Sequence, residues 1–99
     1  MKEDIAVLKA KLNMETSVIA WKELQRFFAS GMVLRVDGQL DLVEVGCQIS
    51  LDNKQQVEQW LMEGSLRQVQ DQEARKWFEE DTALWALVVR PWVLVQDRT

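Results

Sequence analysis

The chain has 99 residues with 12 basic and 16 acidic side chains, a formal net charge of −4, five tryptophans, one cysteine, and neither histidine nor tyrosine. Because histidine is the commonest general base and zinc ligand, its absence excludes Ser-His and Cys-His nucleophilic sites and histidine-based metal sites. The lone Cys47 excludes an internal disulfide and any four-thiolate site. A chain of this length fits one domain over residues 1–99.

Nothing in the sequence indicates a membrane or secretory segment. The N-terminal stretch lacks the uninterrupted apolar region of a secretory signal. The longest apolar run, residues 83–89, is far shorter than the roughly 18 residues of a bilayer crossing. We therefore expect a soluble, cytoplasmic protein, in which an unpaired thiol is ordinary. Its acidic balance disfavours nonspecific attraction to nucleic acid or anionic lipid.

The first third of the chain carries helical spacing. Apolar residues recur every three or four positions over residues 3–13, which predicts a short amphipathic helix or an ordered arm. A hydroxyl cap at Thr16 or Ser17 and an apolar stripe that reaches Phe28 predict a helix of about three turns. Gly31 is placed to end that helix in the left-handed conformation.

The middle of the chain is expected to form a strand and then two helices. Residues 32–36 are β-branched and alternating and precede an Asp-Gly pair, which predicts a strand followed by a tight turn. Residues 41–63 predict helix, short turn, helix, because Asp41 and Asp52 each begin a capping-box spacing. Gly64 marks the end of the second helix.

The C-terminal third combines strands with a charged helix. Residues 66–69 predict a brief strand and residues 72–80 a helix with one apolar side. Residues 84–89 and 92–95 are the strongest strand signals in the chain. Because Pro91 cannot donate a ladder hydrogen bond, we expect it to bend the strand or to lie at an edge.

This order of elements predicts an α+β fold. Helix, strand, helix-turn-helix, strand, inserted helix and C-terminal strand is a winged-helix-like arrangement, with residues 72–80 inserted where a simple wing would turn. The alternative is an unrelated two-layer α+β sandwich with helices on one face of a small sheet.

The helix-turn-helix-like segment is the candidate for nucleic-acid contacts. Lys54, Gln55 and Gln59 on its second helix, with Arg67 after it, are the residues that would carry them. Its charge argues against this function, because residues 52–63 hold one base against three acids. A solvated polar face of a core helix is the favoured interpretation.

Three arginines fall on predicted strands. If those strands pair, Arg35, Arg67 and Arg90 would gather into a patch that holds phosphate or carboxylate. Scattered surface arginines are the favoured alternative.

Two groups of carboxylates are the remaining candidates for catalysis or oxygen-only metal binding, and each has a structural explanation as a turn, a cap or a hydrated helix end. Cys47 is expected to be a small buried hydrophobe. The carboxylates are Asp37, Asp41 and Glu44 in one group and Glu79, Glu80 and Asp81 in the other.

The five tryptophans fall into two groups. Trp21, Trp60 and Trp77 lie on the apolar side of predicted helices, where core packing is expected. Trp85 and Trp92 are seven residues apart on predicted strands, so simple alternation places them on opposite faces of the sheet. At least one of the two is expected to stay partly exposed.

Exposed tryptophan and arginine are typical of binding surfaces. Trp85, Arg90 and Trp92 are therefore the predicted anchors of a contact surface in the C-terminal strand region. A two-sided core strand covered by the N-terminal helix is the alternative.

Four stretches resemble a family of short bacterial proteins classed as a domain of unknown function: ETSVIAWKELQRFFASG, LDLVEVG, VEQWLMEG and RPWVLVQ. The resemblance covers almost the whole chain and implies a single cytoplasmic domain, with no reaction, cofactor or partner to carry over. The matching positions of its first and last motifs are Leu12, Glu15, Thr16, Ile19, Trp21, Glu23, Leu24 and residues 91–96.

The sequence thus favours a noncatalytic protein that binds another protein or itself through the C-terminal strand region. It indicates no cofactor and no metal site. Nucleic-acid binding through residues 41–63 is the alternative, and a carboxylate-dependent enzyme or metal site is a further one.

Overall fold

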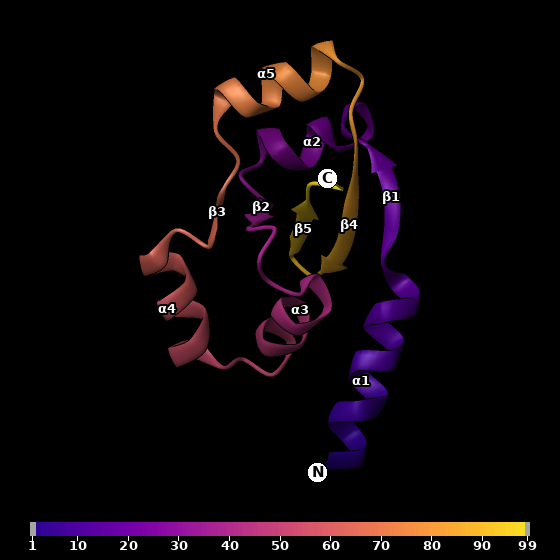
Figure 1. Cartoon of the computed structure of the whole chain (residues 1–99), viewed down its shortest axis with the longest axis vertical. Helices are drawn as coiled ribbons and strands as arrows, with labels where there is room; N and C mark the ends of the chain where they lie inside the picture. The colour runs from indigo at the N-terminus through magenta and orange to yellow at the C-terminus, as the bar shows by residue number, and fades with distance from the viewer. Residues whose placement is uncertain (1, 99) are drawn as a thin grey trace.

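One mixed five-stranded sheet organises the chain (Figure 1). The computed structural model describes residues 2–98. The strands are β1 (Ser17–Ala20), β2 (Val33–Val36), β3 (Leu66–Gln68), β4 (Ala83–Val89) and β5 (Trp92–Gln96). The helices are α1 (Lys2–Glu15), α2 (Gln25–Ala29), α3 (Leu42–Ser50), α4 (Lys54–Glu63) and α5 (Asp71–Glu79), with the short 3₁₀ helix η1 (Trp21–Leu24) before α2.

The strands lie in the order β1-β4-β5-β2-β3. β4 and β5 form an antiparallel hairpin at the centre, and β5 pairs parallel with β2. The two outer strands are both antiparallel to their neighbours, β1 to β4 and β3 to β2. The sheet is therefore built from segments that are distant in the sequence, and its two edges come from short strands.

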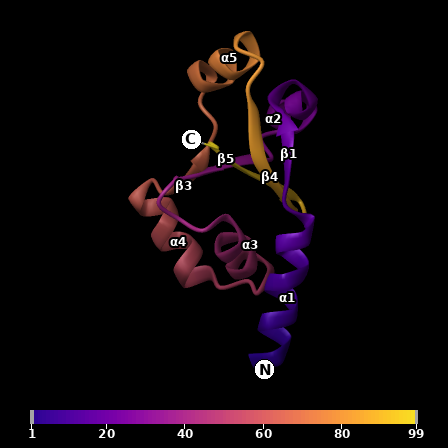
Figure 2. The same cartoon turned by 45° about the vertical axis from the view of Figure 1, so that its right-hand side comes forward.

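Helices cover both faces of this sheet. The first face packs against α1, α3 and α4, and its cluster of buried residues includes Leu12, Val45, Trp60, Leu87 and Leu94. Figure 2 shows α5 and α2 at the opposite end of the molecule from α3 and α4. There the second face packs in a cluster that holds Trp21, Leu24, Val33, Trp77, Leu84 and Val95.

Close approach of α3 to the sheet depends on a glycine. A Cβ atom at Gly46 would lie 2.7 Å from Leu87 Cδ2 and 3.3 Å from Val89 Cγ2. A side chain there would force either Leu87 or α3 to shift, so Gly46 permits the close packing of the helix on β4.

The α+β class is confirmed, whereas the finer arrangement differs from both predicted ones. A winged helix presents a small wing beside a helical core, but here five strands form a sheet with an apolar cluster on each face. A two-layer sandwich would leave one face without helices. Helices cover both faces here because β2, β4 and β5 carry buried apolar residues on both faces.

The helix predicted from Thr16 or Ser17 to Phe28 is wrong over its first half. Residues 17–20 form β1, and only residues 25–29 form an α-helix, α2. Thr16 does not cap a following helix; its hydroxyl and its N–H donate to the carbonyl of Leu12 and close the end of α1. Pairing with β4 outweighed the helical spacing, since Val18 and Ile19 are β-branched and suit a strand.

The predicted caps are partly confirmed. The Asp41 carboxylate accepts from the N–H groups of Val43 and Glu44 at the start of α3. α4 is capped by Asn53, not Asp52, which adopts a left-handed φ of 56°. Gly31 and Gly64 follow their helices with φ of 72° and 78°, as predicted.

Residues 84–95 form a hairpin and not one bent strand. Arg90 and Pro91 make the turn, and Val89 pairs with Trp92 across it. Both strands are interior to the sheet. Pro91 lies in the turn between them, where no ladder hydrogen bond is required of it. The reversal places Trp85 and Trp92 on the same face, which corrects the prediction of opposite faces.

Candidate binding surfaces

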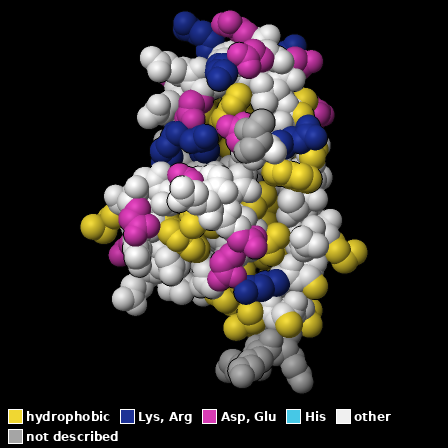
Figure 3. Space-filling view, in the orientation of Figure 1, with side chains coloured by type: hydrophobic (Ala, Val, Ile, Leu, Met, Phe, Trp, Pro, Cys, Tyr) yellow, Lys and Arg dark blue, Asp and Glu magenta, His cyan; other side chains and the backbone are white. Residues whose placement is uncertain are grey.

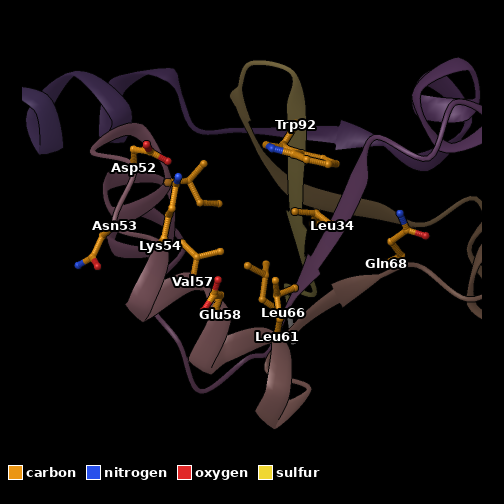
Figure 4. Close-up of a pocket in the computed structure, with 11 residues that line it drawn as sticks. Leu34, Asp52, Asn53, Lys54, Val57, Glu58, Leu61, Leu66, Gln68 and Trp92 are labelled. Atoms are coloured by element: carbon orange, nitrogen blue, oxygen red, sulfur yellow. The ribbon is translucent and has the colours of Figure 1, made fainter.

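A pocket of about 380 Å³ lies between α4 and the β5-β2-β3 side of the sheet. Figure 4 shows side chains from the strands and from α4 turned toward the same space. We name it the Trp92 pocket, after the half-buried indole in its wall. Its apolar lining consists of Leu34, Ile49, Val57, Leu61, Leu66 and Trp92.

The local sequence explains why these residues meet. Leu34 and Trp92 stand on the same face of β2 and β5, which are neighbouring strands. Val57 and Leu61 are four residues apart and share one side of α4. α4 does not close the pocket, because Leu61 on its pocket side remains 48% exposed.

Charged and amide groups stand only at the rim of the Trp92 pocket. All five are exposed, and they come from the α3–α4 turn, the first half of α4 and the end of β3. They are Asp52, Asn53, Lys54, Glu58 and Gln68. The interior therefore offers contact to hydrocarbon, while the rim offers hydrogen bonds and charge.

Trp85 lies on the same face but outside this pocket. It is 40% exposed, its cross-strand neighbour Val18 is 42% exposed, and the Arg98 guanidinium stands 6.0 Å from its ring centroid. Trp85 also borders a separate open hollow of about 500 Å³ beside Leu40 and Leu42. The predicted partly exposed tryptophan is thus found, stacked against a cation.

The structure separates the three predicted anchors. Trp92 lines one pocket and Trp85 borders another hollow, while exposed Arg90 lies at the hairpin turn beside a third hollow against α1. Trp85 pairs with Gln96 and lies four residues from the position opposite Trp92. Trp85 and Trp92 therefore lie on the same face of the β4–β5 hairpin but do not form one continuous surface.

Two of the three strand arginines do meet. Arg35 and Arg67 are register partners on β2 and β3, whereas Arg90 lies at the distant hairpin turn. The Glu73 carboxylate accepts from Arg67 Nη1 and Nη2 at 2.7 and 2.9 Å, and it lies 3.2 Å from Arg35 Nε. Arg35 Nη2 also reaches Asp97 at 3.4 Å.

This cluster is an internal ion-pair network. The hydrogen bonds from Arg67 hold the pKa of Glu73 below its ordinary value, aided by the Gln70 N–H and by Arg35, although partial burial opposes the shift. Two acids balance two arginines, so no positive charge is left over for an anionic ligand. Sequence reasoning missed Glu73, yet its place three residues after Gln70 is the capping spacing that brings its carboxylate back.

The residues predicted for nucleic-acid contact are dispersed or occupied. Lys54 and Gln55 are exposed at the start of α4, and the Gln59 amide donates to Glu63. Arg67 is held by Glu73. On the face in Figure 3, acidic and basic side chains alternate without a single-sign region.

The carboxylate groups predicted as alternatives lie mostly at the surface. Within residues 4–98, no cluster of three or more acidic or thiol groups is placed to hold a metal ion. Cys47 is fully buried, as predicted, and burial raises the pKa of its thiol. No helix in the part of the chain that the structure describes has the length and apolar character needed to cross a membrane.

Comparison with known proteins identifies the family of the chain. Residues 7–97 match the model of a family described as protein of unknown function, DUF2288. The chain belongs to this family. A search of the curated proteins found no match.

The DUF2288 chain also resembles a solved structure, described as the NMR solution structure of PA1075 from Pseudomonas aeruginosa. The two sequences are 48% identical, the match covers 94% of this chain and 86% of the other, and the TM-score is 0.81. The resemblance noted from the sequence motifs is therefore confirmed at the level of family and fold.

Proposed function

We propose that this DUF2288 protein is a noncatalytic binding module that takes an apolar side chain of a partner protein into the Trp92 pocket. The observation that carries the proposal is the pocket of about 380 Å³ walled by aliphatic side chains and one indole. Pockets of this size accept small ligands or a large side chain. Indole walls contribute strongly to protein interfaces because they bury a large area with little loss of conformational freedom.

The chemistry of the lining favours binding over catalysis. Leu34, Leu66 and Trp92 present no nucleophile, general base or oxyanion donor to the interior. The rim groups are exposed to water, which weakens the electrostatic contribution that a catalytic site needs.

Charge at the rim favours one kind of partner. Asp52 and Glu58 outnumber Lys54, and the whole chain carries a net charge of −4. A segment with a lysine or arginine next to its apolar anchor is therefore favoured over an acidic segment.

The test is selection of binding peptides from a random library against the folded protein, followed by mapping of the binding site by NMR. We expect selected peptides to combine a large apolar residue with a neighbouring base and to shift the Trp92 indole N–H resonance. Leu61→Lys places a charge in the pocket wall and should weaken binding by at least about tenfold. Its matched control is Met62→Lys, because Met62 is 88% exposed and lies outside the pocket lining.

Two results would overturn the proposal. One is a set of selected peptides that shift resonances elsewhere and leave Trp92 unchanged. The other is a folded Leu61→Lys variant that binds the selected peptides as tightly as Met62→Lys does.

A further inference from the structure

The free edge of β1 carries backbone groups that point away from the sheet. β1 is the outermost strand in Figure 1. The N–H of Trp21 donates to the carbonyl of Thr82 at 2.8 Å, in the same register as the β1–β4 pairing. Because bonded and non-bonded pairs alternate in an antiparallel ladder, Ile19 bonds to β4 while Val18 and Ala20 direct their N–H groups outward.

These outward groups are unpaired in the part of the chain that the structure describes. No backbone or side-chain partner within residues 2–98 reaches the N–H of Val18 or Ala20, or the carbonyl of Val18. Natural sheets protect such edges with charged side chains or proline, and Ser17–Ala20 contains neither. The edge is thus a template for another strand.

We propose that this edge pairs with the β1 edge of a second copy of the chain, antiparallel and centred on Val18. A two-fold axis perpendicular to the sheet makes the contact identical for both copies. Val18 of each copy then donates to the carbonyl of the partner's Val18, and the N–H of Ala20 reaches the carbonyl of the partner's Thr16. The two five-stranded sheets become one continuous sheet.

Side chains also favour a second copy as the occupant. Val18 and Trp85 are cross-strand neighbours on the same face, and both are partly exposed. Centring on Val18 joins the two pairs into one apolar row across the interface. No charged residue lies between Glu15 and Lys22, so antiparallel pairing of the two β1 strands brings no like charges together.

This contact is independent of the Trp92 pocket and is tested by the mass of the protein in solution. The wild type should have the mass of two chains by size-exclusion chromatography with light scattering, and should dissociate on dilution. Val18→Lys places two ammonium groups side by side and should give one chain, as should Val18→Glu. An equimolar mixture of the two variants should recover the mass of two chains.

Two further variants separate the β1 edge from other effects. Gln68→Lys adds the same charge at the β3 edge and should keep the wild-type mass. Ala20→Pro should give one chain while remaining folded, because φ of Ala20 is −65°, the value that proline imposes, and its N–H makes no bond within residues 2–98.

Three outcomes would overturn the proposal. They are a wild type that has the mass of one chain from micromolar to millimolar concentration, a Val18→Lys variant that stays dimeric, and a mixture of the two charge variants that stays monomeric. If Ala20→Pro does not fold, the charge variants decide, because Val18 is exposed and tolerates substitution.

Discussion

Both edge strands of the sheet direct backbone N–H and carbonyl groups away from the sheet, and the two edges differ in the side chains that cover these groups. At the β3 edge, the Asp37 N–H donates to the Ser65 carbonyl, so by the same alternation the groups of Gln68 point outward. There Arg67 donates to the outward carbonyl of Gln68 at 3.2 Å while Glu73 holds the arginine. The β1 edge has no comparable cover among the described residues.

The difference between the two edges lies in their side chains and not in the topology. Both edge strands are short, and both are antiparallel to their neighbours. At the β3 edge an ion-paired arginine covers the outward carbonyl of Gln68, whereas Ser17–Ala20 at the β1 edge carries no charged side chain. We therefore expect changes at β3 to alter stability first, and changes at β1 to alter association first.

The largest expected effect comes from Glu73→Ala. It removes the acceptor of two partly buried arginines and of the Gln70 N–H, and should lower the free energy of unfolding by about 2 to 3 kcal/mol. Urea denaturation measures the change. The matched control is Glu79→Ala on the same helix. Equal losses of unfolding free energy in the two variants would contradict a stabilising role for the Glu73 ion pairs.

A smaller loss of stability, with a gain in association, is expected from Arg67→Ala. Losing the bidentate pair should cost about 1 to 2 kcal/mol, and the uncovered Gln68 carbonyl should allow strand pairing at β3. Light scattering at high concentration should detect species larger than the dimer. Arg75→Ala on the exposed side of α5 is the control. An Arg67→Ala protein that associates no further than this control would contradict the proposed difference between the β1 and β3 edges.

The dependence on pH should follow Glu73. Its pKa in the folded protein is lowered, mainly by Arg67, so its contribution to stability is complete above the ordinary glutamate value and is lost as the pH falls through the lower folded value. Below about pH 4.3 the wild type should lose stability more steeply than Glu73→Gln does. Urea denaturation at successive acidic pH values measures this, and parallel slopes for the two proteins would contradict it.

The smallest effect is expected from Lys9→Ala, remote from both edges. Lys9 contacts Glu44 at 2.7 Å between α1 and α3, but both side chains are well exposed. Such pairs contribute little because water and salt screen them. Denaturation curves and the mass in solution should match those of the wild type within error.

Much of the fold was predictable because local signals agree with packing. Asp41, Gly31 and Gly64 begin or end helices as their chemistry requires, and Trp21 and Trp77 are buried as their helical positions indicated. Residues 17–20 were mispredicted because their spacing fits a helix, while long-range pairing with β4 makes them a strand.

The candidate sites were harder to predict because they depend on which strands become neighbours. Trp92 was singled out from its residue type and its place on a predicted strand, but Leu34, Leu66 and Leu61 join it only through sheet order and the position of α4. The open edge of β1 could not be predicted from the sequence for the same reason. Which backbone groups of Val18 point outward follows from the register with β4, and the sequence does not specify that register.

Amide hydrogen exchange at Val18 tests the open edge of β1 most directly. If β1 pairs with a second copy, the Val18 and Ala20 amides should exchange slowly at high protein concentration and progressively faster on dilution. The Gln68 amide at the β3 edge should show no such dependence. Fast exchange of the Val18 amide at every concentration would contradict the pairing.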